Sequence, residues 1–350
     1  MLTTIKCFLY DNIRLNTFLK EIFNYLSIHE CPGVSLKKGY AQGFHISIRI
    51  EEENEPFIDF IKEQYILYTA PGAVDYEKAE RLIKAVARME ENGEVMLPLL
   101  QDGSLLISGD LNFSPRKKVY SIQTQAAIEK IQTEFLTGIY AYWSNIDENQ
   151  QNYIMAYLFM LLGSYSPDGL KSGYLAMRSN YEYFVEQLKD IGHEDKRKEW
   201  KHYISFRNEQ DLYFIQNGVA DFFEKKCPVE KEAEKYLEKL RELLRDSYNN
   251  GGVNTQALYS AATFFERHEH SSSFHQLFYK NNEFLENYEE KNFTLYRLIL
   301  GEIYSLFPEL NMSNLRKQKI TGLTAEAVEA YYKISWKDVY DGWLKTNRDI

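Results

Sequence analysis

Eight residues near the N-terminus, from Gly43 to Ile50, alternate strictly between apolar and polar side chains. Successive side chains of a β-strand point to opposite sides, so this stretch predicts a strand with one apolar face, which packs on a core. The opposite face would carry a titratable base, a hydroxyl and a permanent cation, from His45, Ser47 and Arg49. These side chains have two interpretations, a solvated outer face or a functional site.

The rest of the first third predicts a mixed sheet with helices packed on it. Periodicity and turn residues predict a strand at 5–10, a hairpin of 94–100 with 104–108, and helices at 12–29, 56–68 and 75–91.

From Tyr120 onward the pattern is almost entirely helical. The helices are predicted at 122–143, 149–162, 174–190, 196–207, 212–224, 229–248, 254–266, 273–289, 292–307, 311–317, 324–332 and 336–343. No repeat or low-complexity linker divides the chain, so we expect one α+β domain over 1–350, with a sheet-containing part (1–119) and a helical part (120–350).

Composition narrows the classes of partner. The net charge of −10 argues against nucleic acid, because phosphate binding relies on Lys and Arg. No apolar run approaches the ~20 residues that cross a bilayer, and the N-terminus lacks the layout of a signal peptide. Cys7, Cys31 and Cys227 are odd in number and unmatched in spacing. We therefore expect a cytoplasmic protein with reduced thiols, without membrane or nucleic-acid partners.

A second stretch, 293–307, predicts a helix with two different faces. Its apolar residues recur at helical spacing, while Arg297, Gly301, Tyr304 and Ser305 share another side. A glycine inside a helix costs roughly 1 kcal/mol relative to alanine, so Gly301 marks a close approach by another group. That group is either a neighbouring helix or a substrate backbone, for which Tyr304 and Ser305 would supply polar contacts.

Metal and cofactor signals are weak. His268, His270 and His275 lie close in sequence, but a run of serines between them indicates a loop, and no cysteine or carboxylate pair has ligand spacing. The basic cluster 116–118 is either a solvated loop or a contact for an acidic peptide. No phosphate-binding loop, nucleophile elbow or dinucleotide fingerprint is present. We expect neither a metal nor a cofactor.

The strand with His45 and Arg49 resembles the His-Leu-Arg-Leu-Arg-Phe strand of the C-terminal, glutamate-eliminating domain of lantibiotic dehydratases, which also occurs as stand-alone proteins of thiopeptide biosynthesis. The order of the remaining elements matches over most of the chain. Three motifs depart from the eliminating enzymes. Ser47 replaces their first strand arginine, Val119-Tyr120-Ser121-Ile122 replaces Arg-Tyr-Gly-Gly, and Gly301-Glu302-Ile303 replaces a His-Met-His-type motif. Groups expected to activate a glutamyl ester are thus missing.

The chain is therefore similar to the branch that keeps the fold and loses those groups, the thiopeptide pyridine synthases. The resemblance implies a late-stage macrocyclase that joins two dehydroalanines of a modified precursor peptide into a pyridine, with loss of water and of the leader peptide. It implies no cofactor. Positioning would be the largest contribution, because good orientation can supply ~7–11 kcal/mol.

Under this resemblance each candidate residue has an expected role. Tyr304 and Ser305 would hydrogen-bond the reacting amide. His45 would be the general acid–base group because its unperturbed pKa lies near neutrality, and Arg49 would stabilise oxyanion character. Gly301 would make room where the eliminating enzymes place an imidazole, and Glu302 would be a second base or face solvent. The remaining substrate-binding candidates are Ser47, Tyr120, Tyr40 and Arg297.

Two alternatives stay open. One is a split glutamate-elimination enzyme that forms dehydroalanine; the other is a non-catalytic scaffold that binds a leader peptide and other peptide-modifying enzymes. Leader binding would use an exposed strand edge or hairpin, because an extended peptide adds to a sheet edge through main-chain hydrogen bonds. A homodimer is a further open option.

Overall fold

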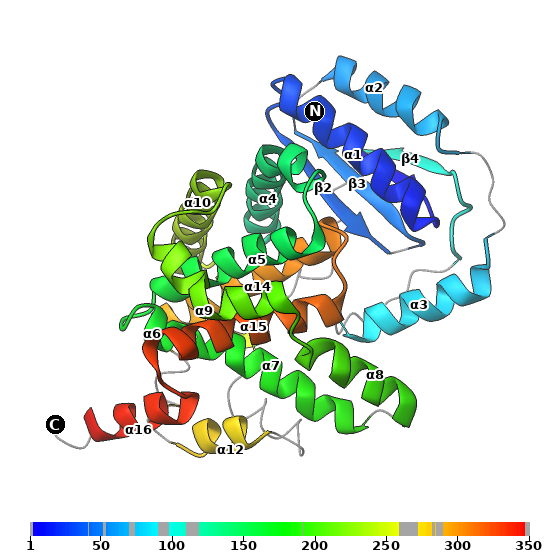
Figure 1. Ribbon diagram of the computed structural model, residues 1–350. Helices are drawn as coiled ribbons and strands as arrows, with labels where there is room; N and C mark the ends of the chain where they lie inside the picture. Colours follow the sequence, from blue (N-terminus) through cyan, green and yellow to red (C-terminus); the bar gives the residue numbers. More distant parts are fainter. Residues whose placement is uncertain are drawn as a thin grey trace. The chain divides into compact units, whose positions relative to one another are not determined.

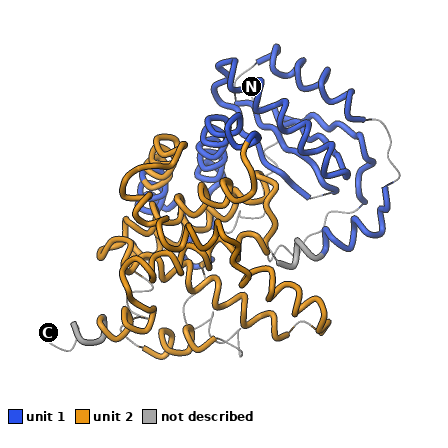
Figure 2. The backbone as a smooth tube through the Cα atoms, viewed as in Figure 1, with its two compact units in different colours: residues 1–145, 242–257 blue, residues 146–241, 258–350 orange. Residues whose placement is uncertain are grey.

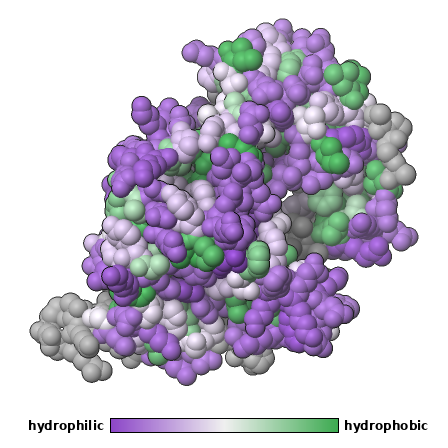
Figure 3. All heavy atoms as spheres, viewed as in Figure 1, coloured by the Kyte–Doolittle hydropathy of each residue, from purple (hydrophilic) through white to green (hydrophobic). Residues whose placement is uncertain are grey.

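The computed structural model describes residues 3–40, 42–51, 54–69, 74–89, 98–109, 119–190, 192–258, 272–281, 284 and 290–346. The fold is α+β, as expected. The chain forms two compact units (Figure 2): unit 1 comprises Met1–Asn145 and Glu242–Ala257, and unit 2 comprises Ile146–Arg241 and Leu258–Ile350. Hydrophilic side chains predominate on the face drawn in Figure 3. Within the described residues, no helix has both the length and the apolar character needed to span a membrane.

Unit 1 contains a four-stranded antiparallel sheet (Figure 1). Its strands are β1 (Thr3–Phe8), β2 (Val34–Gly39), β3 (His45–Ile50) and β4 (Leu105–Ser108), in the spatial order β2-β3-β1-β4. The helices α1 (Asn12–Ile28), α2 (Glu55–Ile66) and α3 (Tyr76–Met89) lie between strands along the chain. This order of strands and connections is the split β-α-β arrangement of ferredoxin-like folds.

The sequence located β3, α1 and α2 well but misplaced other parts of the sheet. β1 begins and ends two residues before the predicted 5–10, and β2 was not predicted. β4 pairs with β1, and residues 98–100, expected in a hairpin strand, form no strand. The predicted strand residues 94–97 lie outside the described residues.

The helix α4 (Ile122–Trp143) packs against α1 and against the edge strand β2. It begins where predicted, because the Ser121 side chain accepts a hydrogen bond from the backbone N–H of Thr124 and caps the first turn. The Thr133 hydroxyl accepts a hydrogen bond of 2.8 Å from the backbone N–H of Leu36 in β2. These contacts fix α4 beside the sheet and determine where its buried polar residues lie.

Unit 2 is helical. Its helices are α5 (Glu148–Ser164), α6 (Leu170–Gly173), α7 (Leu175–Gln187), α8 (Glu194–Ser205), α9 (Glu209–Phe223), the first part of α10 (Glu230–Asn249), α12 (Ser273–Tyr279), α14 (Lys291–Glu309), α15 (Asn314–Tyr332) and α16 (Trp336–Thr346). α5 is buried on almost every side, as expected for a helix that is apolar all round. α15 contacts α5, α7, α8 and α9. These two helices form the centre of the unit.

Three helix predictions after residue 250 were wrong within the described residues. α15 is one continuous helix, although the sequence predicted two helices with a break over 318–323. Within the predicted break, α15 packs closely on α7, since a Cβ on Gly322 would stand 2.7 Å from the Tyr181 ring. The helix predicted at 273–289 ends at Tyr279, and 254–266 begins with a 3₁₀ turn at Thr255–Ala257 instead of an α-helix. Residues 259–271, 282, 283 and 285–289 of these predicted helices and their surroundings lie outside the described residues.

Candidate active site

The polar face of β3 is buried and forms three rows with the neighbouring strands. Across β2, β3 and β1, the rows are Gly39–His45–Phe8, Lys37–Ser47–Lys6 and Ser35–Arg49–Thr4. The exposed fraction is only 3% for His45 and 6% for Arg49, while Ser47 is half-buried. A solvated outer face is therefore the wrong interpretation of this side of the strand.

A buried carboxylate on α4 holds the Arg49 guanidinium. Arg49 Nη2 lies 3.0 Å from Glu129 Oε2, and Lys37 Nζ lies 3.7 Å from Glu129 Oε1. Gln125 Nε2 donates a hydrogen bond of 2.9 Å to the same Oε1. Arg49 is thus a fixed cation in a site of low dielectric constant, where electrostatic interactions are stronger than in water.

The His45 imidazole is buried and neutral at pH 7. Its Nδ1 lies 2.8 Å from the carbonyl oxygen of Gly43, which can only accept, so Nδ1 carries the proton and Nε2 is left as an acceptor. The pKa of His45 is lowered from 6.5 to about 4, mainly by burial; the hydrogen bond to the Gly43 carbonyl opposes the shift and the nearby Lys6 ammonium adds to it. The near-neutral pKa that made His45 an acid–base candidate is therefore absent from the folded protein.

The lowered pKa predicts an acid-sensitive contribution to stability. Above pH 6.5 His45 is neutral in both the folded and unfolded chains; between pH 6.5 and 4 only the unfolded chain takes up the proton, so folding is disfavoured as the pH falls. The shift from 6.5 to about 4 corresponds to about 3 kcal/mol lost across this window. Urea unfolding at pH 7 and pH 4 should show a smaller acid loss in His45→Gln than in the wild type. The exposed His193, replaced likewise, should leave the loss unchanged; equal losses in all three proteins would contradict the assignment.

Gly39 makes room for the His45 ring. A Cβ on Gly39 would stand 2.4 Å from His45 Nε2, closer than real contacts allow. We expect Gly39→Ala to destabilise the protein by about 1–3 kcal/mol, as other overpacked cores are destabilised, and to shift the NMR signals of the His45 ring. Gly192→Ala is the control, because no described atom lies within 4 Å of its added Cβ. An unchanged His45 spectrum in Gly39→Ala would refute the contact.

The sequence interpretation missed Lys6, which lies opposite Ser47 on β1. Its exposed fraction is 7%, and burial lowers the pKa of its ammonium group. Thr4 and Lys6 alternate with apolar Ile5 and Cys7, so the sequence already placed Lys6 on a polar strand face, although apolar Phe8 interrupts the pattern. Glu129 was missed because helical spacing alone does not say what a polar residue contacts.

In unit 2, α14 places four of the predicted residues on one side. Arg297, Gly301, Tyr304 and Ser305 are all half-buried. Within the described residues, and apart from the backbone of α14 itself, no atom lies within 4 Å of a Cβ built on Gly301. A described neighbouring helix packed against this glycine is therefore not the reason for it.

The Tyr304 hydroxyl is buried, and burial raises its pKa; the Asn180 side chain on α7 opposes the shift. The Tyr304 ring meets Phe159 edge-on at a centroid distance of 5.7 Å, and Lys317 Nζ lies 4.6 Å from the ring centroid. Tyr304 is consequently protonated at neutral pH and suited to donate a hydrogen bond. Asn180 and Lys317 gave no sequence signal, since nothing in their spacing relates them to Tyr304.

Glu302 and Ser305 face each other within one turn of α14. The exposed fraction of Glu302 is 1%, so the alternative that this residue faces solvent is wrong. Ser305 Oγ donates to the Glu302 carbonyl oxygen at 2.7 Å and lies 3.3 Å from Glu302 Oε2. A buried carboxylate beside a hydroxyl is a reasonable proton acceptor.

The remaining candidates are placed as follows. Tyr120 is buried and forms an isolated bridge with Val253, and half-buried Tyr40 accepts a hydrogen bond from Gly43 N–H through its carbonyl oxygen. Both belong to unit 1 with β3, whereas the α14 residues belong to unit 2.

Of the histidines considered as metal ligands, His275 is buried, with Nδ1 2.8 Å from Ser272 Oγ and Nε2 2.9 Å from Ser179 Oγ. The other two histidines considered as ligands, and the basic cluster 116–118, lie outside the described residues.

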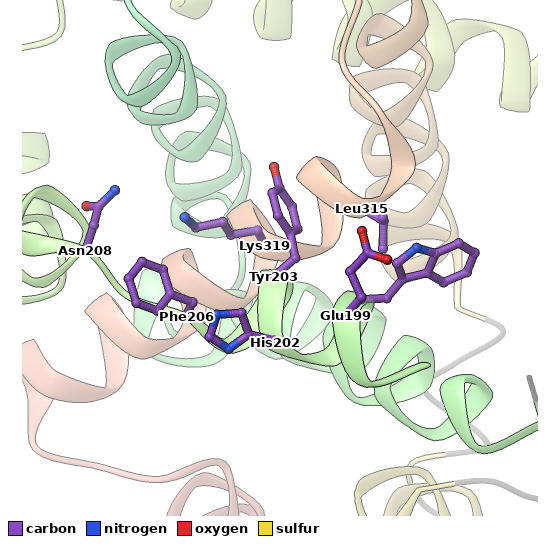
Figure 4. Close-up of a pocket in the computed structure, with 8 residues that line it drawn as sticks. Glu199, His202, Tyr203, Phe206, Asn208, Leu315 and Lys319 are labelled. Carbon is purple, nitrogen blue, oxygen red and sulfur yellow. The ribbon is translucent and has the colours of Figure 1, made fainter. Parts of the chain in front are cut away.

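A shallow hollow of about 380 Å³ lies elsewhere in unit 2 (Figure 4). Its lining residues, none of them predicted, are Glu199, Trp200, His202, Tyr203, Phe206, Asn208, Leu315 and Lys319. Lys319, the cation of this lining, is already paired with buried Asp211 at 2.8 Å. The hollow therefore offers mainly aromatic and apolar surface.

No protein-family model matches the sequence, and no curated protein matches it. Among solved structures, the chain is similar to the pyridine synthase TbtD from thiomuracin biosynthesis, with a TM-score of 0.61 and 14% identity, covering 95% of this chain and 99% of that one. It is also similar to TsrL, with a TM-score of 0.58 and 10% identity, covering 95% and 96%. These likenesses establish the α+β fold over nearly the whole chain.

Proposed function

We propose that this protein is a thiopeptide pyridine synthase. It joins two dehydroalanines of a leader-bearing, modified precursor peptide into a pyridine, then eliminates water and the leader peptide as an amide. The observation that carries the proposal is the fold similarity to TbtD over nearly the full length of both chains. The absence of the arginine and histidine motifs of the eliminating enzymes, in the stretches around Ser47, Tyr120 and Gly301, agrees with it.

The buried hydroxyl of Tyr304 has the properties that this reaction needs. One reacting amide must pass into its imidic form, and a protonated hydroxyl stabilises the charge that develops on its oxygen. Burial keeps Tyr304 protonated and strengthens a hydrogen bond to the substrate relative to the same bond in water. Glu302, with Ser305 beside it, is the proton acceptor assigned on the same helix.

On β3, the proposed roles follow from charge. Arg49 is held by Glu129 and can stabilise a partial negative charge without first losing a water shell. His45 is neutral, so its role is to accept a hydrogen bond or proton through Nε2 rather than to supply a proton as an imidazolium. Ser47, Tyr40, Tyr120 and Arg297 remain proposed substrate contacts, and Gly301 a proposed space for the substrate.

The test is mass spectrometry of a linear peptide with a leader, azoles and two dehydroalanines, incubated with this protein alone. We expect release of an amidated leader and a macrocycle lighter by that leader and one water. If this peptide is unchanged but a glutamylated peptide loses glutamate, the protein is a split elimination enzyme. If neither peptide changes while the leader still binds, the protein is a scaffold and the proposal fails.

A further inference from the structure

The row Lys37–Ser47–Lys6 places a hydroxyl between two ammonium groups on the buried polar face of the sheet. Lys6 and Lys37 lie directly opposite Ser47 on the two neighbouring strands. Strand spacing places the Cβ atom of each lysine about 5 Å from that of Ser47. The adjacent row adds Arg49. Ser47 therefore lies among three cationic residues on this face.

Lys6 and Ser47 keep their donors unused. Within the described residues, neither side chain makes a hydrogen bond or ion pair, whereas Arg49 and Lys37 share Glu129. The Lys6 side chain is largely buried, but its ammonium nitrogen keeps some contact with solvent, so a ligand can reach it. Burial lowers the pKa of this ammonium group, and partial desolvation of an ammonium group without a carboxylate beside it costs stability. Such a group is expected where a ligand supplies the missing partner.

The charges on this face favour an anion. Across the three rows and the Glu129 carboxylate, three cations (Lys6, Lys37 and Arg49) face one carboxylate, and His45 is neutral. The excess is positive in a chain whose net charge is −10. An oxygen anion over Ser47 would receive the Lys6 ammonium and the Ser47 hydroxyl as donors, in charge-assisted hydrogen bonds.

We propose that Lys6 and Ser47 form an anion-binding site for an oxygen anion of a peptide. The anion has two sources with the same chemistry: a carboxylate of the bound peptide, or the oxyanion that develops on a reacting amide. The carboxylate source stands independently of the proposed function. The oxyanion source rests on it.

The binding test is NMR of protein labelled at the lysine ε-carbons and the histidine rings. The probe is N-acetylglycine, and its neutral amide is the control ligand. We expect N-acetylglycine to shift the Lys6 and His45 signals saturably, since His45 senses the Lys6 charge, and the amide to shift neither. Lys6→Met should abolish the response. Lys62→Met, at a lysine of the same unit whose side chain is 44% exposed and pairs with Asp59, should preserve it.

Turnover of the linear peptide tests the second source. If N-acetylglycine shifts nothing, but Lys6→Met lowers kcat at least tenfold at unchanged KM and Lys62→Met does not, the anion is the oxyanion of the reacting amide. If the wild type is active, N-acetylglycine shifts no signal and Lys6→Met leaves kcat unchanged, the proposal is overturned. If the wild type converts no peptide, the pyridine synthase function fails, and the N-acetylglycine response alone decides the site. Lys6→Met should unfold at the same or a higher temperature, so a lost response does not reflect lost folding.

Discussion

Replacing Glu129 by glutamine is expected to lower the free energy of unfolding by about 3–5 kcal/mol, the range for breaking one partner of a buried ion pair. Glu129 contacts Arg49, Lys37 and Gln125 in a site almost closed to solvent. Removing its charge takes away the carboxylate that faces the buried Arg49 guanidinium at 3.0 Å. Urea unfolding monitored by circular dichroism measures the loss.

A double-mutant cycle separates the ion pair from general packing. Arg49→Met combined with Glu129→Gln should be less destabilised than the sum of the two single variants, because the second replacement removes the charge that the first left uncompensated. Glu63→Gln, at an exposed position of α2, should change stability by less than about 0.5 kcal/mol. Additive losses in the cycle would show that Glu129 does not stabilise Arg49.

Replacing Tyr304 by phenylalanine is expected to lower kcat for pyridine formation by about 10²–10³, the effect of removing one donor to a developing oxyanion. The ring contact with Phe159 and the ammonium of Lys317 remain available to phenylalanine. The fold should therefore be retained, and the loss should appear in kcat. Single-turnover mass spectrometry of the linear peptide measures it.

Tyr296 on the same helix provides the matched control. Its hydroxyl donates a hydrogen bond of 2.8 Å to the Gly173 carbonyl oxygen, which is a structural contact. Tyr296→Phe should cost about 1 kcal/mol of stability and leave kcat unchanged. Equal kcat losses in the two variants would mean that the Tyr304 hydroxyl acts through packing and not on the substrate.

The elements with strong periodicity were predicted well from the sequence. α4 has the predicted bounds, because Ser121 caps it and its apolar residues recur without interruption. β2 was missed because Lys37 and Lys38 interrupt the apolar alternation after Leu36. The break predicted in α15 was wrong because Lys319 is stabilised by Asp211 of another helix, a partner that local sequence does not reveal.

The positions of the candidate residues could be predicted from the sequence, but their chemical environment could not. The face shared by His45, Ser47 and Arg49 follows from strand geometry, and the side shared by Gly301 and Tyr304 follows from helix geometry. The protonation state of His45 did not follow, since it depends on burial beneath neighbouring elements and on the charge of Lys6 from another strand. Local spacing predicts which side chains share a face but not the dielectric environment of that face.

The hydrogen bond from the Leu36 N–H to Thr133 has a consequence for how an extended peptide is recognised. β2 is an edge strand, and the outward N–H of such a strand is the group that an added strand would use. At Leu36 this donor is already satisfied by a helix hydroxyl. The same contact protects the edge from pairing with a second copy of the chain. An incoming peptide that extends a β-sheet must therefore pair somewhere other than this point of β2.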